Sequence, residues 1–584
     1  MQISQDRDQH VHRHHEAHLS VDSSTQEPVH LRPAHSDTSA VNVGAHTQPI
    51  GVLTEEPITL SPVNVELLCK LLKNHPNQDL VDYVLFGLEH GFSLGFQGDV
   101  LQSTGRNLKS AHQNSEAVSK SIAVEVERGH TVGPFPSPPL DSFHCSPLGA
   151  VVKKDGSARL ILDLSSPKGS SVNDGIDPET FAVKYCSFDE AVNMVREIGP
   201  GAYMAKADIR HAFRLCPVNP EEYHLLGYSW NDAFYYDVRL PFGGRSSPFI
   251  FNSFADLLCW ILHYVFLIAY VIHYLDDYFW CNISYDSCLS DKDNLLECWH
   301  DLGVPIAPDK LEGPATSMIF LGIEIDSVEG VTRLPDEKLA EVLSILGDWH
   351  GKKKCTKRDL LSLIGSLSHA AKVIKPGRLF LRRLIDLSKT AKKLHHHIDI
   401  TSEARLDIEW WLEFLPKWNG KEKIQPAPIT CFDLELSTDA SCIGIGGSFG
   451  NQWFSYPIQH FRRLSWMFQE DVFDINLWEM FALVFAVFSW GKSWQDKQIM
   501  IYVDNLSITY IWLRGCKCKV MMRLVRKLFL FTARHNINIL LQHIPGHSNI
   551  LADRLSRLQV QEFHQRVPTA DPHSSPLPPE IWNL

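Results

Sequence analysis

The sequence predicts an α+β chain in which a basic helical segment separates two domains that begin with strands. Three observations support this fold class. Strand and helix patterns alternate between residues 146 and 330, and residues 335–420 are mostly helical. Strands then return from residue 431, after a connector that contains three prolines. Strands interleaved with helices are typical of a sheet with helices on one face.

Composition and charge set the broad class. With 44% hydrophobic and 21% charged residues, the 584-residue chain should be globular and divide into roughly three to five domains. A net charge of -13 argues against coating nucleic acid over the whole surface. However, residues 351–395 contain thirteen Lys and Arg against two Asp, and residues 505–552 contain seven basic and no acidic residues. The two basic segments indicate local contacts with a polyanion, or else ordinary solvated helix faces.

The sequence contains only weak signals for a cellular compartment or for membrane association. Thirteen cysteines show no metal-ligand spacing, and no leader pattern opens the chain, so we expect an intracellular protein of the cytoplasm or nucleus. The longest apolar run, residues 257–272, falls short of a membrane span. We therefore expect a buried helix followed by a strand there, and no membrane partner.

The ends of the chain are polar. Residues 1–55, rich in His, Ser, Thr and Gln, are predicted to be disordered, with a histidine cluster that could bind metal adventitiously. Residues 56–133 show helical periodicity and form a helical lead-in. Residues 561–584 contain five prolines and are predicted to be a disordered tail.

Residues 134–330 form the first domain with strands. Residues 150–154 and 159–164 flank an Asp-Gly turn and predict a hairpin with basic residues near its tip. Further strands are expected at 204–208, 234–240, 270–281 and 319–326. Helices are expected at 188–198, 248–265 and 287–302.

Three carboxylates are expected to converge in this domain. Asp208 ends one predicted strand, and Asp276 and Asp277 lie where another strand turns back. An adjacent pair of carboxylates in an apolar hairpin is costly unless a cation neutralises it. Two hard cations with oxygen ligands would activate a hydroxyl and stabilise a leaving pyrophosphate. Taken alone, the pair could also be a solvated turn.

The residues Tyr274, Leu275, Asp276 and Asp277 resemble the signature of reverse transcriptases. Three further blocks follow that family's order along the chain. Residues 206–213 resemble its first catalytic motif, residues 240–251 its template and nucleotide loop, and residues 320–322 its primer grip. The resemblance implies a right-hand polymerase with fingers, a ferredoxin-like palm and, at residues 331–427, a helical basic thumb and connection.

The resemblance also implies roles for individual residues. Asp208, Asp276 and Asp277 would bind two Mg²⁺ ions, or Mn²⁺, and join a dNTP to a primer 3′-hydroxyl. Phe213 would be the steric gate against the ribose 2′-hydroxyl. The residues implied to bind nucleotide are Lys153, Lys154, Arg159, Phe213, Phe242, Gly243 and Lys310, with the choice between the two lysines open. The primer grip would be Phe320, Leu321 and Gly322.

Residues 428–560 contain a second set of carboxylates. Asp439 and Asp504 end predicted strands, and Glu479 and Asp553 lie on predicted helices. Oxygen ligands brought from separate elements to one point are what a two-metal nuclease requires. Any one of the four could instead be a helix cap or a surface acid.

This second set is similar to that of α/β ribonuclease H domains, in the version found in gypsy-like retroelements, and residues 206–213 and 235–249 also resemble the DIRS-like group. The resemblance implies that Asp439, Glu479, Asp504 and Asp553 bind Mg²⁺ and cleave the RNA strand of an RNA–DNA hybrid. Retroviral enzymes add a histidine near the last aspartate. Here His543 has the expected spacing from the last aspartate but lies on a predicted strand. His547 lies in the expected kind of loop but is closer to that aspartate. The sequence therefore assigns neither histidine.

Together these resemblances imply a retrotransposon reverse transcriptase with a C-terminal ribonuclease H. Its partners would be an RNA template, a DNA primer, the RNA–DNA hybrid, dNTPs and other retroelement proteins. A decayed element product that only binds nucleic acid is the alternative, although no carboxylate ligand is missing. An RNA-dependent RNA polymerase would not explain Phe213 or the nuclease residues.

Overall fold

The computed structural model describes residues 61–98, 105–153, 156–420, 422–424, 434–464, 474–495, 497–516, 518–535 and 537–584. The described residues all belong to one compact unit, which begins at residue 59. The predicted disordered segment 1–55, its histidine cluster and Lys154 lie outside the described residues. Within the described residues, no helix is both long and apolar enough to span a membrane.

The lead-in segment contains four helices: α1 (Val65–Leu71), α2 (Gln78–His90), α3 (Lys109–Gln113) and α4 (Ser115–Glu127). Asn64 and Asn77 begin the first two helices, because each side chain accepts a hydrogen bond from a backbone N–H of the first turn. The helical expectation for this segment agrees with the structure.

The fingers contain two small sheets. In the first, β1 (Thr131–Phe135) pairs with β6 (Ala233–Asp237), which pairs with β5 (Gly227–Trp230). The second is the expected hairpin of β2 (Leu148–Val152) and β3 (Ala158–Leu162).

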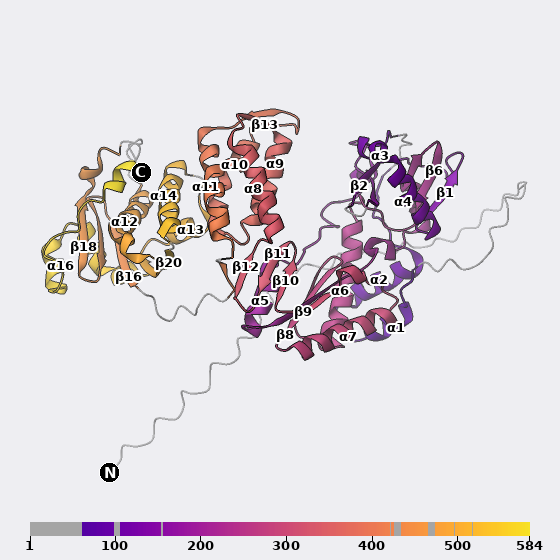
Figure 1. The fold of residues 1–584 in the computed structure, drawn as a ribbon, viewed down its shortest axis with the longest axis horizontal. Helices are drawn as coiled ribbons and strands as arrows, with labels where there is room; N and C mark the ends of the chain where they lie inside the picture. The colour runs from indigo at the N-terminus through magenta and orange to yellow at the C-terminus, as the bar shows by residue number, and fades with distance from the viewer. Residues whose placement is uncertain are drawn as a thin grey trace, which may run out of the picture. The chain divides into compact units, whose positions relative to one another are not determined.

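The palm is a four-stranded sheet in the order β7 (Val271–Tyr274), β8 (Asp277–Asn282), β4 (Tyr203–Asp208) and β9 (Glu312–Ala315). Its helices are α5 (Phe188–Ile198), α6 (Ser247–Tyr264) and α7 (Tyr285–Asp301), close to the ranges expected (Figure 1). A capping box between Ser187 and Glu190 begins α5.

Helices cover both faces of the palm sheet, where the sequence predicted one face. Tyr278 and Trp280 are buried with residues of α6 and α7. The alternate residues Phe279 and Cys281 are buried with residues of α5. Successive side chains of a strand point to opposite faces, so the continuous apolar run in β8 is the signal of two covered faces.

The segment after the palm holds a second sheet and the thumb. The sheet has the order β10 (Ser317–Phe320), β11 (Ile323–Asp326), β12 (Val331–Arg333) and β15 (Glu422–Lys423). The thumb contains α8 (Asp336–His350), α9 (Lys357–Ala370), α10 (Arg382–Ser388) and α11 (Ser402–Trp418), with a short pairing of β13 (Lys354–Thr356) and β14 (His397–Asp399). The helical expectation for this region agrees.

The C-terminal domain is a five-stranded sheet in the order β18 (Gln452–Pro457), β17 (Gly444–Phe449), β16 (Leu434–Ala440), β19 (Gln498–Val503) and β20 (Asn538–His543). The first three strands are antiparallel, and the last two run parallel to β16. The helices are α12 (Ile475–Trp490), α13 (Leu506–Arg514), α14 (Lys519–His535) and α15 (Ile550–Ser556) (Figure 1). This is the ribonuclease H-like topology expected.

The prediction of a disordered tail at 561–584 is wrong. The segment contains α16 (Val560–Arg566) and η10 (Pro579–Asn583), and Phe563, Ile581 and Leu584 are buried. The indole nitrogen of Trp453 donates to the Asp571 carbonyl at 2.7 Å. Five prolines suggested a loose segment, but prolines also lower the entropy that the chain loses on docking, and a few apolar side chains then suffice.

Candidate active sites

The first candidate site lies at one end of the palm sheet. Asp208 is the last residue of β4 and pairs in register with Asp277, the first residue of β8. Directly opposed residues of antiparallel strands have neighbouring side chains. Asp276 lies in the tight turn between β7 and β8, where Leu275 has a φ of 54°. The hairpin therefore places the three predicted carboxylates together.

Burial and mutual repulsion raise the pKa of two of these carboxylates. Loss of solvation raises the pKa of Asp276, and the charge of Asp208 adds to this effect. The pKa of Asp277 is raised by the same desolvation and by the charge of Asp276. Asp208 is only 5% exposed. Such a group of oxygen donors fits divalent cations, which would remove the repulsion.

Lys310 contacts the same carboxylates. Its Nζ lies 2.5 Å from Oδ2 of Asp208. Desolvation opposes the ammonium charge, but the hydrogen bond and the charge of Asp208 outweigh it, so the pKa of Lys310 is raised. Lys310 therefore stays protonated beside the palm carboxylates.

Aromatic rings connect the remaining nucleotide residues. The guanidinium carbon of Arg159 lies 4.9 Å from the ring centre of Phe242, a cation–π distance. The ring of Phe213 lies 5.0 Å from that of Phe242 and 5.7 Å from that of Phe251. Lys153 is exposed at the end of the β2–β3 hairpin, and Lys154 is not described, so the choice between them stays open.

The backbone conformation and close packing at position 243 require glycine. Its φ is 117°, and a Cβ atom there would lie 1.9 Å from the Leu162 carbonyl oxygen. The Leu162 amide in turn donates to the Phe242 carbonyl at 2.9 Å. The nucleotide loop is therefore pressed against strand β3 of the fingers.

Sequence reasoning missed Asn173, whose side chain hydrogen-bonds to the backbone of this loop. Its amide nitrogen donates to the Gly243 carbonyl at 2.9 Å, and its amide oxygen accepts from the Arg245 backbone at 2.8 Å. The side chain is buried. Nothing in the local pattern of a lone asparagine 70 residues upstream predicts this contact.

The residues predicted as the primer grip lie at the end of β10 and in the turn between β10 and β11. Leu321 and Gly322 have φ angles of 47° and 75°. Nε2 of His369, on thumb helix α9, lies 3.0 Å from the Leu321 carbonyl, a hydrogen bond that sequence reasoning also missed. Ile319, Gly322 and His369 line a groove of about 730 Å³ next to this turn.

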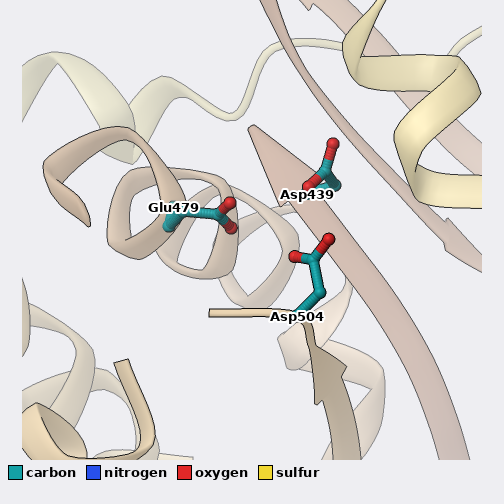
Figure 2. Close-up of side chains that lie close together, drawn as sticks. All are labelled: Asp439, Glu479 and Asp504. Atoms are coloured by element: carbon teal, nitrogen blue, oxygen red, sulfur yellow. The ribbon is translucent and has the colours of Figure 1, made fainter. Parts of the chain in front are cut away.

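The second candidate site lies in the C-terminal domain. Figure 2 shows Asp439 on strand β16, Glu479 on helix α12 and Asp504 just after strand β19, with their carboxylates turned toward one point. Each offers an oxygen atom, and these atoms lie within 4.8 Å of one another. The three side chains line a cleft of about 540 Å³.

The second site also fits divalent cations. Desolvation raises the pKa of Glu479, which is 4% exposed, and the charges of Asp439 and Asp504 add to it. Desolvation likewise raises the pKa of Asp439. Among the described residues, Oε2 of Glu479 and Oδ1 of Asp504 are buried without a hydrogen-bond partner. Buried oxygens of this kind need a ligand, and cations supply one.

Asp553 and His543 line the same cleft. Asp553, on α15, forms an ion pair with Arg557 at 2.7 Å. Ser556, on the same helix, donates a hydrogen bond to Asp439, which ties α15 to the site. His547 does not line the cleft, so the structure favours His543 as the histidine near the carboxylates.

Comparison with known proteins identifies the first domain. Residues 151–325 match the family model described as reverse transcriptase (RNA-dependent DNA polymerase). This segment is a reverse transcriptase domain. The matched residues of this domain contain Asp208, Asp276, Asp277 and Lys310 and exclude all four carboxylates of the second site.

Relatives extend the similarity beyond the reverse transcriptase domain. The chain is 24% identical to a putative enzymatic polyprotein of Cassava vein mosaic virus, over 74% of the chain and 63% of that protein. It is 22% identical to the Pol polyproteins of the Drosophila melanogaster transposons opus and gypsy, over 72% and 65% of the chain. It covers only 40% and 35% of those two proteins.

Among solved structures, the chain is similar to the foamy viral protease-reverse transcriptase in complex with an RNA/DNA hybrid. The identity is 16%, the TM-score is 0.46, and the similarity covers 85% of this chain and 65% of that one. A second structure, described as the foamy viral protease-reverse transcriptase dRH in complex with double-stranded DNA, has the same TM-score and covers 86% of this chain and 84% of that one.

Replacing Gly243 by alanine should disable the reverse transcriptase domain. The added Cβ would overlap the Leu162 carbonyl, and the φ of 117° disfavours any L side chain. We expect a loss of about 2–4 kcal/mol in the free energy of unfolding and a raised KM for dNTPs. Thermal unfolding and steady-state kinetics measure both. Gly156→Ala, at a position with φ of 81° but open space, is the matched control, and equal losses in both variants would contradict the role of the Leu162 contact.

Glu479→Gln should stabilise the metal-free protein at pH 8. A carboxyl whose pKa is higher in the folded than in the unfolded state opposes folding above the unfolded pKa, and this cost grows as pH rises. The unfolding temperature in EDTA should therefore fall for the wild type from about pH 5 to pH 8 and fall less for the variant. Added Mg²⁺ should raise it only in the wild type. Glu435→Gln, on an exposed residue of β16, is the control. A variant less stable than the wild type at pH 8 would refute this account.

Proposed function

We propose that this chain is an RNA-directed DNA polymerase that extends a primer with dNTPs and also degrades the RNA strand of RNA–DNA hybrids during retrotransposon replication. The reverse transcriptase family match supports the first activity. The observation that carries the second is the approach of Asp439, Glu479 and Asp504 to within 4.8 Å on a separate domain.

In the polymerase site, Asp208, Asp276 and Asp277 would hold the ions. Two divalent cations, when bound, supply the charge that activates an attacking oxygen and stabilises a leaving one in each site. Lys310, protonated beside Asp208, adds positive charge where a leaving pyrophosphate needs it. Arg159, next to Phe242, lies in position to neutralise a triphosphate, because guanidinium groups pair with phosphate oxygens.

In the nuclease site, Asp439, Glu479, Asp504 and Asp553 would hold the ions and orient a water toward the scissile phosphate. His543 lines the same cleft. The water oxygen would bond to the phosphorus of the RNA strand as the bond from phosphorus to the 3′-oxygen breaks, which would give a 5′-phosphate on one fragment and a 3′-hydroxyl on the other.

The partners of this proposal are an RNA template, a DNA primer, the hybrid they form, and dNTPs. The basic segment of residues 351–395 lies in the thumb, on helices α9 and α10 and on the segments that flank and connect them, and further basic residues lie on α14. Lys and Arg on helices contact the phosphate backbone without reading sequence. Mg²⁺, or Mn²⁺, would be the cofactor of both sites.

Extension of oligo(dT) on poly(rA) by the purified chain tests the proposal. We expect dTTP incorporation that requires Mg²⁺ and stops in EDTA, together with shortening of a labelled RNA strand in a hybrid. A folded chain that binds the duplex but makes no DNA and cuts no RNA would instead be the decayed, binding-only product.

A further inference from the structure

Arg214, the residue after Phe213, is a buried charge. Both lie in η2 (Ala212–Leu215), a single turn that begins after His211 in the left-handed conformation, with φ of 61°. The Arg214 side chain is 8% exposed. Phe213 turns instead toward Phe242 and the nucleotide loop. The side chains of Phe213 and Arg214 therefore make their contacts on opposite sides of the η2 turn.

Two carboxylates from other parts of the chain neutralise Arg214. Its Nη1 donates to Oδ2 of Asp237, at the end of β6, at 2.8 Å. Its Nε lies 3.0 Å from Oε2 of Glu125, on helix α4 of the lead-in segment. Asp237 is 5% exposed and also accepts a hydrogen bond from Thr131 at 2.5 Å.

Glu125 is held in turn by its own neighbours. His130 Nδ1 lies 3.1 Å from Glu125 Oε2, and Arg128 Nη1 lies 3.8 Å from Oε1. Burial alone would raise the pKa of Glu125, but His130 and Arg214 lower it to about 2, so the carboxylate stays charged. The network thus joins α4, the neighbouring strands β1 and β6 of a fingers sheet and the turn that follows Asp208.

We infer that Glu125 and Asp237 are positioning residues for sugar selection: by fixing Arg214, they hold Phe213 at the distance from the nucleotide that excludes a ribose. This rests on the proposed function and on the role of steric gate that the family resemblance implies for Phe213. Breaking a buried ion pair leaves an uncompensated charge, which must move toward solvent. Arg214 and Phe213 are adjacent in the one-turn element η2, so we expect a shift of Arg214 toward solvent to displace Phe213 as well.

Selectivity between dNTP and rNTP, measured as the ratio of their kcat/KM values, tests this inference. We expect Glu125→Gln and Asp237→Asn each to lower the ratio about tenfold, mainly through better use of the rNTP, since contacts of one group in a pocket set discrimination of about this size. Glu127→Gln, on an exposed residue of the same helix, should leave the ratio unchanged. A general loss of stability would lower both kcat/KM values and leave their ratio near the wild-type value.

The outcomes separate the inference from the proposed function. A wild type that makes no DNA refutes the proposed function. A wild type and folded variants that make DNA with the same ratio overturn the inference. If the charge variants do not fold, Thr131→Val decides, because it removes the hydrogen bond that Thr131 donates to Asp237 and leaves both carboxylates in place. A lowered ratio in this variant supports the positioning role, and an unchanged ratio overturns it.

Discussion

Asp276→Asn should lower DNA synthesis by roughly a thousandfold or more while cleavage of the hybrid stays within about twofold. The amide has nearly the same shape but cannot balance a divalent cation, and burial together with the charge of Asp208 raises the pKa of Asp276. Primer extension with saturating Mg²⁺ measures the loss. Binding of the primer-template should remain close to that of the wild type.

The control is Asp293→Asn, on an exposed residue in the middle of α7. It removes the same charge from the same domain without touching the carboxylate cluster. If it reduced synthesis as much as Asp276→Asn, the loss would reflect net charge or stability and not the proposed site.

Asp504→Asn should abolish hybrid cleavage and preserve primer extension. Asp504 follows β19 and brings one of the oxygens that meet within 4.8 Å, and its Oδ1 has no hydrogen-bond partner among the described residues. We expect at least about a thousandfold loss, as for other groups that act as a unit. Release of a labelled RNA fragment from a preformed hybrid measures it.

Asp571→Asn is the matched control, since its side chain is exposed and only its backbone contacts the domain. Retained cleavage in Asp504→Asn would remove the basis for a nuclease at this cluster. A loss of primer extension in the same variant would indicate that the variant disturbs the whole chain.

The sequence predicted the elements whose signals are local. The strand pattern before Asp208, the Asp-Gly turn of the fingers hairpin and the capped helix α5 each depend on neighbouring residues. The seven carboxylates were predicted to form two groups. The structure pairs Asp208 with Asp277 in the first group and brings Asp439, Glu479 and Asp504 together in the second. The assignment of their roles remains a prediction.

Long-range contacts could not be predicted in this way. The Asn173 hydrogen bond to Gly243 and the His369 contact with Leu321 span 70 and 48 residues and depend on how whole elements pack. The tail was misjudged for the same reason, because its partners Trp453 and Tyr456 lie more than a hundred residues upstream. The sequence pattern within each of these segments does not indicate hydrogen-bond partners that lie so far away along the chain.

Measuring DNA synthesis and hybrid cleavage in one purified sample tests the central claim most directly. Fractions from a sizing column would be assayed for dTTP incorporation and for hybrid cleavage, with the wild type, Asp276→Asn and Asp504→Asn side by side. The two-site account predicts that both wild-type activities elute together and that each variant loses only its own activity. Loss of both activities in either variant, or elution of the two activities in separate fractions, would contradict it.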